Sequence, residues 1–194
     1  MPLLLASSSA IRRAMLDAAG VEYAGLPANI DEAAVKASIG SDPSAVALEL
    51  AKAKAEAVSA RHPDDWVIGS DSVVSVDGRL FDKPASRENA AEHLRFFSGK
   101  PMRLVSAVAL ARGGASEWSH CDSATLHVRT LSEDFIADYL DREWPAVSYC
   151  VGVFRLEGPG VQLFEGIDGD HFIILGMPLL PLLGALRERA IIES

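Results

Sequence analysis

The hydrophobic pattern predicts that the chain begins with a buried strand followed by an amphipathic helix. The apolar run at residues 3–6 is the length of one short buried strand, and Ser7-Ser8-Ser9 follows it directly. Beyond these serines, apolar residues recur at helical spacing, at Ile11, Met15, Leu16 and Ala19. A serine can therefore cap the first helix at its N-terminus.

This arrangement suits an anion. Backbone N–H groups, serine hydroxyls and the positive end of the helix dipole meet at one turn. Arg12 and Arg13 lie one turn into the helix, so a phosphate would find donors from several directions. The same pattern also fits an ordinary capped helix with surface arginines.

Further along, helical and strand patterns follow one another. Strands are expected at residues 21–26, 66–74, 80–81, 102–111 and 116–129. Helices are expected at residues 45–60, 86–97 and 135–140, and in the leucine-rich stretch that ends at Arg189. The dipeptides Asp77-Gly78 and Gly113-Gly114 predict tight turns between neighbouring strands. No repeat or linker divides the chain, so we expect one domain over residues 1–194, built as two lobes on a shared sheet.

Asp71 interrupts a nearly all-apolar strand. An unpaired charge buried in a strand costs several kcal/mol, so this carboxylate lies either at a cleft or paired within the core. The hairpin at Asp77-Gly78 brings Lys83 back toward Asp71, so that an acid and a base could flank one cleft.

Two other charged positions stand out. Asp31 and Glu32 are adjacent carboxylates at the end of a strand or loop, where they could hold a divalent cation or simply be solvated. The helix expected at residues 45–60 has its apolar residues on one face, and Lys52 and Lys54 project from its other faces. At least one of these lysines is free to reach a site, although solvated lysines are the usual alternative.

Composition narrows the classes of function. The 194 residues carry 18 basic and 27 acidic side chains, a formal net charge of −9, which argues against coating nucleic acid or an anionic membrane. A polyanionic ligand must therefore meet a local basic cluster. Cys121 and Cys150 form no metal or disulfide pattern, and the five histidines show no ligand spacing. The N-terminal apolar run is too short for a targeting segment, and we expect a cytoplasmic protein.

Several short blocks, taken in order, resemble the Maf (septum-formation protein) family over essentially the whole chain. The blocks are Leu5-Ala6-Ser7-Ser8-Ser9-Ala10-Ile11-Arg12-Arg13, Ile30-Asp31-Glu32, Lys54-Ala55, Ile68-Gly69-Ser70-Asp71-Ser72-Val73-Val74, Lys83-Pro84, Phe97-Ser98-Gly99 and Gly176-Met177-Pro178-Leu179. Each block alone means little, but each sits at the separation from the next that the family shows. The resemblance implies an α/β fold, a mixed elongated β-sheet flanked by helices in two lobes with a central cleft, like that of inosine triphosphate pyrophosphatases.

The resemblance also implies an activity and a set of site residues. Family members are nucleoside triphosphate pyrophosphatases that use a divalent metal cation, Mg²⁺ or Mn²⁺, and are thought to clear non-standard nucleotides and to influence septation. Carried over onto this sequence, Asp71 is the general base, and Glu32 with Asp71 is expected at the metal. Phosphate contacts are expected from Ser7, Ser9, Arg12, Arg13, Lys54 and Lys83. Two departures are Ala10-Ile11, where relatives have a proline before the arginine pair, and Asp82, where they have a glycine before Lys83.

A last set of positions bears on the nucleobase. The segment Phe154-Arg155-Leu156-Glu157-Gly158 looks like that of the subgroup acting on 7-methyl-GTP, whereas enzymes for thymidine and uridine triphosphates carry a glutamine. A carboxylate suits the cationic methylated guanine and its N–H donors. At two further positions this chain departs from that subgroup: Ile11 stands where the subgroup often has an aromatic residue that could stack on a cationic base, and Ser72 replaces the usual partner.

We therefore expect hydrolysis of the α–β phosphate bond of 7-methyl-GTP. The alternatives are a dTTP/UTP pyrophosphatase of the same family, a non-catalytic nucleotide-binding regulator of septum formation, and another phosphate-handling enzyme such as a nucleotidyltransferase. The apolar residues 172–175 and the final helix could serve a homodimer interface as well as a core.

Overall fold

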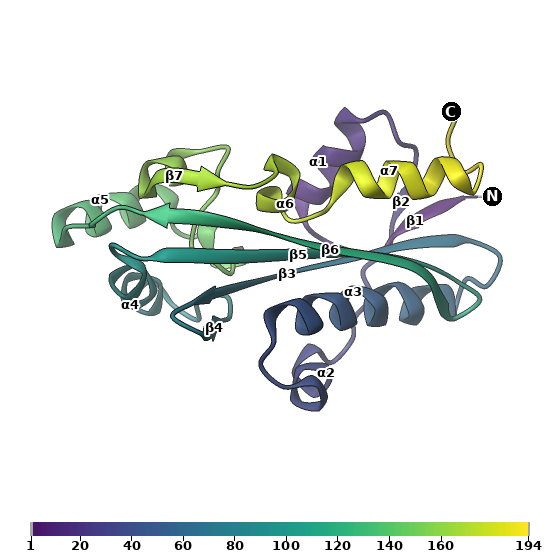
Figure 1. Ribbon diagram of the computed structural model, residues 1–194, viewed down its shortest axis with the longest axis horizontal. Helices are drawn as coiled ribbons and strands as arrows, with labels where there is room; N and C mark the ends of the chain where they lie inside the picture. Colours follow the sequence, from purple (N-terminus) through teal and green to yellow (C-terminus); the bar gives the residue numbers. More distant parts are fainter. Residues whose placement is uncertain (1, 194) are drawn as a thin grey trace. The chain divides into compact units, whose positions relative to one another are not determined.

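The computed structural model describes residues 2–193 (Figure 1). The contacts within the chain divide it into two compact units. Unit 1 comprises Met1–Ser72, Val105–Asp122 and His171–Ser194, and unit 2 comprises Val73–Leu104 and Ser123–Asp170. The long strands pass from one unit into the other along the chain. The expected single domain over residues 1–194, and the cleft between two lobes, stay predictions.

The strands form a mixed sheet. Their bounds are β1 (Leu3–Leu5), β2 (Ala24–Gly25), β3 (Trp66–Val76), β4 (Arg79–Phe81), β5 (Pro101–Arg112), β6 (Ala115–Val128) and β7 (Phe164–Asp168). The hydrogen-bonded order is β2-β1-β3-β5-β6-β7, and β4 pairs with β3. Strand β1 is parallel to both β2 and β3, whereas the β3–β4 and β6–β7 pairs are antiparallel. The expected mixed α/β architecture, a sheet flanked by helices, is confirmed.

The helices begin where short polar side chains can cap them. Their bounds are α1 (Ala10–Ala18), α2 (Glu32–Ile39), α3 (Pro43–Ser59), α4 (Arg87–Phe97), α5 (Glu133–Glu143), α6 (His171–Leu175) and α7 (Leu179–Glu188), with 3₁₀ turns η1 (Ala146–Tyr149) and η2 (Pro159–Leu163). Helices α1 to α5 each follow a serine or aspartate whose side chain accepts a hydrogen bond from the backbone N–H three residues on, at Ser9, Asp31, Asp42, Ser86 and Ser132.

The structure differs from the expected elements at three places. Asp31 ends the loop after β2, as expected, but a helix that the sequence pattern does not predict begins there: Asp31 Oδ1 accepts the Ala34 N–H at 3.0 Å and caps α2, whose first residue is Glu32. The strand expected at residues 21–26 shrinks to β2, and residues 161–167, for which the sequence predicts no element, form the end of η2 and most of β7. Helix α2 has no buried residue, so its apolar pattern gives a weak signal in the sequence.

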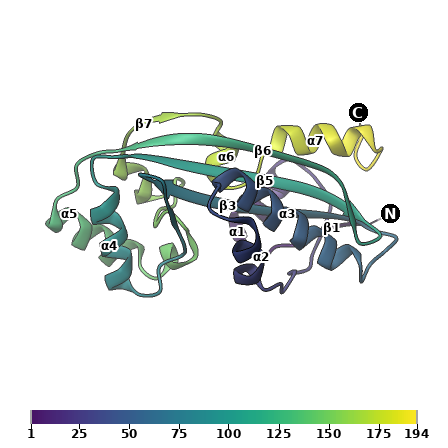
Figure 2. The ribbon, with the colours of Figure 1, turned by 60° about the horizontal axis from the view of Figure 1, so that its bottom comes forward.

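In unit 1, helices cover both faces of the sheet. One face packs Leu3, Leu5 and Ile68 against Met15 and Leu16 of α1, in a cluster that also contains Leu179, Leu182 and Leu186 of α7. Because successive residues of a strand point to opposite faces, Gly69 lies on the other face, and α3 packs there. Figures 1 and 2 both show α3 and α7 on opposite sides of these strands, with α2 beside α3.

Gly69 allows α3 to lie directly on β3. A Cβ placed at Gly69 would come within 2.1 Å of the Ala51 carbonyl oxygen and 2.6 Å of the Ala55 backbone nitrogen. These are backbone atoms of α3, which cannot move aside as a flexible side chain could. The glycine therefore sets the distance between helix and strand.

Unit 2 is held by helices α4 and α5 and an aromatic cluster. Two ion pairs join the helices, Arg95 with Glu133 and Arg87 with Asp141. Buried His93 meets the Phe81 ring edge to face at 5.1 Å between centroids, and Phe97 also packs on Phe81. Burial lowers the pKa of His93, and the positive charge of Arg79 lowers it further.

The apolar stretch at residues 172–175 lies in α6, a helix of five residues in unit 1. Between residues 2 and 193 no helix has both the length and the apolar character needed to cross a membrane.

Replacing Gly69 with alanine should destabilise the protein. The added methyl group meets helix backbone, so we expect the free energy of unfolding to fall by about 2 kcal/mol or more, measured by urea denaturation. Gly184 in α7 is the matched control, because nothing lies within 4 Å of its added Cβ. Gly184→Ala should raise stability by up to about 1 kcal/mol. Equal effects at the two positions would contradict the close approach of α3.

His93 should make stability depend on pH. Its pKa is lowered in the folded state, so below its ordinary value of 6.5 the unfolded chain takes up a proton that the folded chain resists. Stability should therefore fall as the pH drops from about 6.5 toward the folded pKa. His93→Phe should flatten this slope in urea denaturation between pH 8 and pH 5, whereas Phe97→Leu, in the same cluster, should lower stability equally at every pH. An unchanged slope in His93→Phe would refute the assignment.

Candidate functional site

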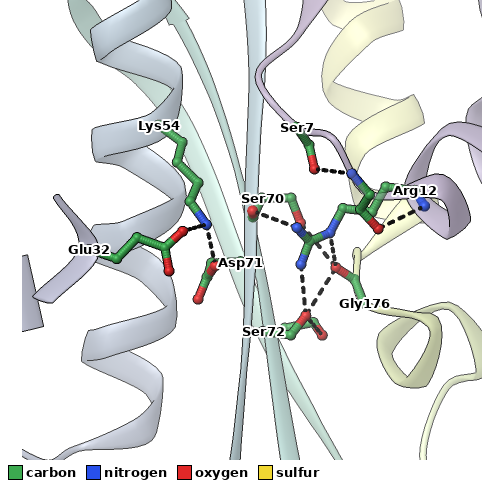
Figure 3. A network of polar contacts seen from close by, with 10 residues as sticks. Ser7, Arg12, Glu32, Lys54, Ser70, Asp71, Ser72 and Gly176 are labelled. Atoms are coloured by element: carbon green, nitrogen blue, oxygen red, sulfur yellow. Dashed lines mark hydrogen bonds and ion pairs between the residues drawn. The ribbon is translucent and has the colours of Figure 1, made fainter. Parts of the chain in front are cut away.

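Lys54 joins two carboxylates in unit 1 (Figure 3). Its Nζ lies 2.5 Å from Asp71 Oδ1 and 2.8 Å from Glu32 Oε1. The side chains of Lys54 and Asp71 are 12% and 11% exposed, whereas that of Glu32 is 46% exposed. One nearly buried ammonium therefore fixes a nearly buried carboxylate and one that opens to solvent.

The contact between α3 and β3 explains this placement. Asp71 is two residues beyond Gly69 on β3, so both residues face α3. Lys54 is next to Ala55, which contacts Gly69. The lysine nominated in the sequence thus reaches Asp71, while Lys52 pairs with Glu49 of its own helix at 2.9 Å.

The serine-rich turn between β1 and α1 is held by its own side chains. Buried Ser7 accepts the Ser9 N–H through Oγ at 3.1 Å, and Ser9 Oγ accepts the Arg12 N–H at 3.5 Å. The turn therefore ends in a capped helix N-terminus, with Ser8 exposed between the two serines. Such a turn has the backbone geometry that binds anions.

Arg12 turns its guanidinium toward the protein. Its Nε donates to the Gly176 carbonyl at 2.9 Å, and its two terminal nitrogens donate to the Ser70 carbonyl at 3.0 Å and to Ser72 Oγ at 3.1 Å (Figure 3). Burial lowers the pKa of Arg12, and the negative charges of Asp71 and Glu32 oppose that shift. Three of its five N–H bonds are directed at these acceptors, which leaves two for a ligand.

The carbonyl of Gly176 gathers the segment after α6 onto β3. Besides Arg12, it accepts hydrogen bonds from Ser70 Oγ at 3.0 Å and Ser72 Oγ at 3.2 Å. Gly176 has a φ of +105°, which a side chain would strain. Ser72 also lies 2.9 Å from Ser106 Oγ, and Ser106 donates to the Ile173 carbonyl at 2.8 Å. Hydroxyls on both sides of Asp71 in the sequence are thus fully engaged.

The remaining nominated residues of unit 1 are more open. Arg13 is exposed and donates to the Ser8 carbonyl at 2.9 Å, so its charge stands beside the serine turn. Ile11 is half-buried in the first turn of α1.

Lys83 and Glu157 belong to unit 2, and both are exposed. Both charges act on the Cys150 thiol. Burial raises the pKa of Cys150 to about 11, Glu157 adds to the rise, and Arg155 and Lys83 oppose it. At neutral pH this cysteine is a thiol, and both Cys121 and Cys150 are free.

Glu32 and Asp71 could hold a divalent cation together with a substrate. Within residues 2–193 no three His, Cys, Asp or Glu side chains gather as a complete protein site. Two carboxylates that converge on one ammonium offer oxygen ligands of the kind Mg²⁺ takes, and Mg²⁺ is commonly held by one or two carboxylates with substrate phosphates. The residues therefore fit a metal completed by the substrate.

Sequence reasoning missed Ser70, Ser106 and the Gly176 carbonyl as parts of this network. Ser70 and Ser106 are fully buried in apolar strands, and a polar residue inside such a strand is a signal of a required hydrogen bond. The Gly176 carbonyl left no such signal, because a backbone acceptor has no side chain to read.

Comparisons with known proteins agree along the whole chain. A relative from Rhizobium etli named "7-methyl-GTP pyrophosphatase" is 52% identical, covering 99% of this chain and 98% of its own length. A "Nucleoside triphosphate pyrophosphatase" from Granulibacter bethesdensis is 48% identical over 97% of both chains. Among solved structures, a nucleoside-triphosphatase, or dITP/XTP pyrophosphatase, from Mycobacterium abscessus aligns with a TM-score of 0.45 at 18% identity, covering 98% of this chain and 96% of that one.

The family comparison spans both units. The family model described as "Maf-like protein" matches residues 2–189, which include the serine turn, the cluster at Lys54 and the segment around Gly176. Both this match and the identity to the curated relatives extend over nearly the full length. The chain therefore belongs to the Maf-like protein family.

Proposed function

We propose that this chain is a nucleoside triphosphate pyrophosphatase that hydrolyses the α–β phosphate bond of 7-methyl-GTP, giving 7-methyl-GMP and pyrophosphate, as a cytoplasmic enzyme that cleans the nucleotide pool. The observation that carries the proposal is the full-length similarity at 52% identity to a protein named "7-methyl-GTP pyrophosphatase". The cluster of Glu32, Lys54 and Asp71 supplies chemistry of the kind this reaction needs.

The serine turn is the proposed phosphate cradle. Ser7 and Ser9 shape the turn, and Arg13 adds an exposed positive charge beside it. Arg12 joins the turn to β3 and Gly176 with three of its guanidinium N–H groups, and the other two are the proposed donors to a phosphate. By family resemblance, Lys54 and Lys83 are the proposed lysine contacts to the triphosphate.

Charge balance explains why a metal would be needed. The positive charges of Arg12 and Lys54 are matched by the negative charges of Asp71 and Glu32, so this cluster offers a triphosphate no net positive charge. Arg13 and Lys83 supply part of the missing charge. A divalent cation such as Mg²⁺ or Mn²⁺, held by Glu32 and Asp71, would neutralise developing charge on the phosphates and lower the pKa of water.

Asp71 is the proposed general base. Lys54 holds its carboxylate in one orientation through Oδ1, which leaves Oδ2 to orient a water and accept its proton. The water attacks the α-phosphorus, the bond to the bridging oxygen breaks, and pyrophosphate leaves. Lys54 and the arginines stabilise the charge that grows on the leaving group.

Glu157 is the proposed selector of the base. Its exposed carboxylate can accept the N1–H and N2–H donors of guanine, and its charge favours the cationic methylated ring. A glutamine at this position would lack the charge. Ile11 and Ser72 stay specificity positions by family resemblance alone, and self-association through residues 172–175 and α7 stays a prediction.

A panel of triphosphates tests the proposal against its alternatives. With Mg²⁺ present, pyrophosphate release should be fastest from 7-methyl-GTP. A nucleotide-binding regulator of septum formation would release none, a nucleotidyltransferase would release it only with an acceptor, and a dTTP/UTP pyrophosphatase would rank those substrates first.

Replacing Asp71 with asparagine should lower kcat by about two orders of magnitude or more, because the amide cannot accept the proton. Single-turnover pyrophosphate release from 7-methyl-GTP measures the effect. Asp77→Asn is the matched control: Asp77 lies in the β3–β4 turn at a φ of 51°, which asparagine also adopts. Near-normal turnover in Asp71→Asn would rule out Asp71 as the base.

Replacing Glu157 with glutamine should shift preference from 7-methyl-GTP toward dTTP or UTP, because the charge that favours the methylated base is lost. The measurement is kcat/KM on each of these substrates. Glu165→Gln, an exposed glutamate of β7, should leave the ranking as it is. If Glu157→Gln also leaves it unchanged, Glu157 does not select the base.

A further inference from the structure

The segment that carries Glu157 contains a strained residue. Val153 is fully buried and has a φ of 56°, in the left-handed region that a β-branched side chain rarely adopts. A residue persists in this conformation only where its surroundings impose it, and such residues gather at functional sites. Contacts with other residues of unit 2 must therefore keep the Val153 backbone in this conformation.

Helix α5 holds this segment at two points. The Tyr139 hydroxyl donates to the Val153 carbonyl at 2.9 Å in a buried hydrogen bond. Glu143 accepts two hydrogen bonds from Arg155, from Nε at 2.9 Å and from a terminal nitrogen at 3.0 Å. Tyr139 and Glu143 are four residues apart, so they stand on one face of the helix.

The grip on Arg155 is tight. The Glu143 side chain is only 4% exposed, although it carries a charge. The backbone of Gly160 lies directly against that of Arg155. A Cβ on Gly160 would come within 2.5 Å of the Arg155 carbonyl oxygen and 2.7 Å of the Arg155 backbone nitrogen. Both the backbone and the guanidinium of Arg155 are thus fixed.

Glu157 follows directly from Arg155 in a tight turn. The Gly158 N–H donates to the Arg155 carbonyl at 3.2 Å, which places Glu157 at the third position of a four-residue turn. The turn begins at the residue that Glu143 grips, and the Glu157 carboxylate is exposed beyond it. The direction of that carboxylate therefore depends on the α5 contacts.

The Glu143 side chain is 4% exposed and that of Arg155 is 37% exposed, so the pair buries one of its two charges. Burying a charge is an inefficient way to stabilise a protein, because apolar residues of similar volume often do as well. The pair of Glu143 and Arg155 makes more sense as a device that fixes geometry. We propose that Tyr139 and Glu143 are positioning residues for substrate selection, which act by fixing the 153–158 segment so that Glu157 meets the nucleobase. The inference rests on the proposed function, in which Glu157 selects the base.

The test compares Tyr139→Phe and Glu143→Gln with the unchanged protein. Tyr139→Phe removes the hydroxyl that donates to Val153, and Glu143→Gln removes the charge and one of the two oxygens that accept from Arg155. Both variants keep the shape of the side chain. The ratio of kcat/KM for 7-methyl-GTP to kcat/KM for UTP should fall at least about tenfold, because a misplaced recognition group loses binding to the correct base. The loss should lie in KM for 7-methyl-GTP. The kcat for UTP should stay near normal, since Asp71 and Lys54 belong to unit 1.

Glu133→Gln is the matched control. Glu133 is also on α5 and also accepts a forked pair of hydrogen bonds, from Arg95, but its side chain is 66% exposed. This variant should keep the ratio. A second test replaces both Glu143 and Arg155 with methionine, which removes both charges of the pair together. We expect that double variant to stay folded, as judged by thermal unfolding. Its ratio of kcat/KM for 7-methyl-GTP to kcat/KM for UTP should nevertheless fall as in the single variants.

The outcomes separate the inference from the proposed function. An unchanged ratio in folded Tyr139→Phe and Glu143→Gln, with a changed ratio in Glu157→Gln, overturns the positioning role alone. An unchanged ratio in Glu157→Gln overturns the selection role of Glu157 and the inference with it. If Glu143→Gln fails to fold, Tyr139→Phe and the double methionine variant decide, and a normal ratio in both refutes the proposal.

Discussion

The contact of α3 with β3 at Gly69 is the constraint on which the candidate site depends. Where the backbones of a strand and a helix touch, side chains of the two elements can reach one another. Here Lys54 of the helix lies 2.5 Å from the Asp71 carboxylate of the strand. Any side chain at Gly69 would separate the two elements. The charged cluster therefore depends on packing as much as on charge. Lys54 and Asp71 meet because Gly69, two residues before Asp71, lets the backbones of α3 and β3 approach closely.

The two units position their key carboxylates by different means. In unit 1, a glycine brings two regular elements together, and the ammonium of Lys54 then orients Asp71. In unit 2, Glu157 stands on an irregular segment, and irregular backbone needs external contacts to keep one conformation. Helix α5 supplies these contacts through a hydroxyl and a buried carboxylate. The proposed general base therefore lies on a regular strand, and the proposed base selector lies on an irregular segment that side-chain contacts hold.

Much of this could be read from the sequence, and the remainder has physical reasons. The strand with Asp71, the capped helix after the serines and the Asp77-Gly78 turn follow from local patterns, and all three are present in the structure. The sequence pattern does not predict helix α2, because this helix buries no side chain and so has no apolar stripe. No local pattern in the sequence indicates the ion pair of Glu143 with Arg155, since only tertiary packing leaves Glu143 4% exposed.

The Gly176 carbonyl has a consequence for the order in which the protein is made. Ribosomes synthesise a chain from its N-terminus, so Arg12 emerges 164 residues before its acceptor Gly176, and Ser70 and Ser72 emerge 106 and 104 residues before it. Until residue 176 has left the ribosome, the Arg12 guanidinium and both hydroxyls lack the partner that joins them. The assembled network is therefore a property of the nearly finished chain.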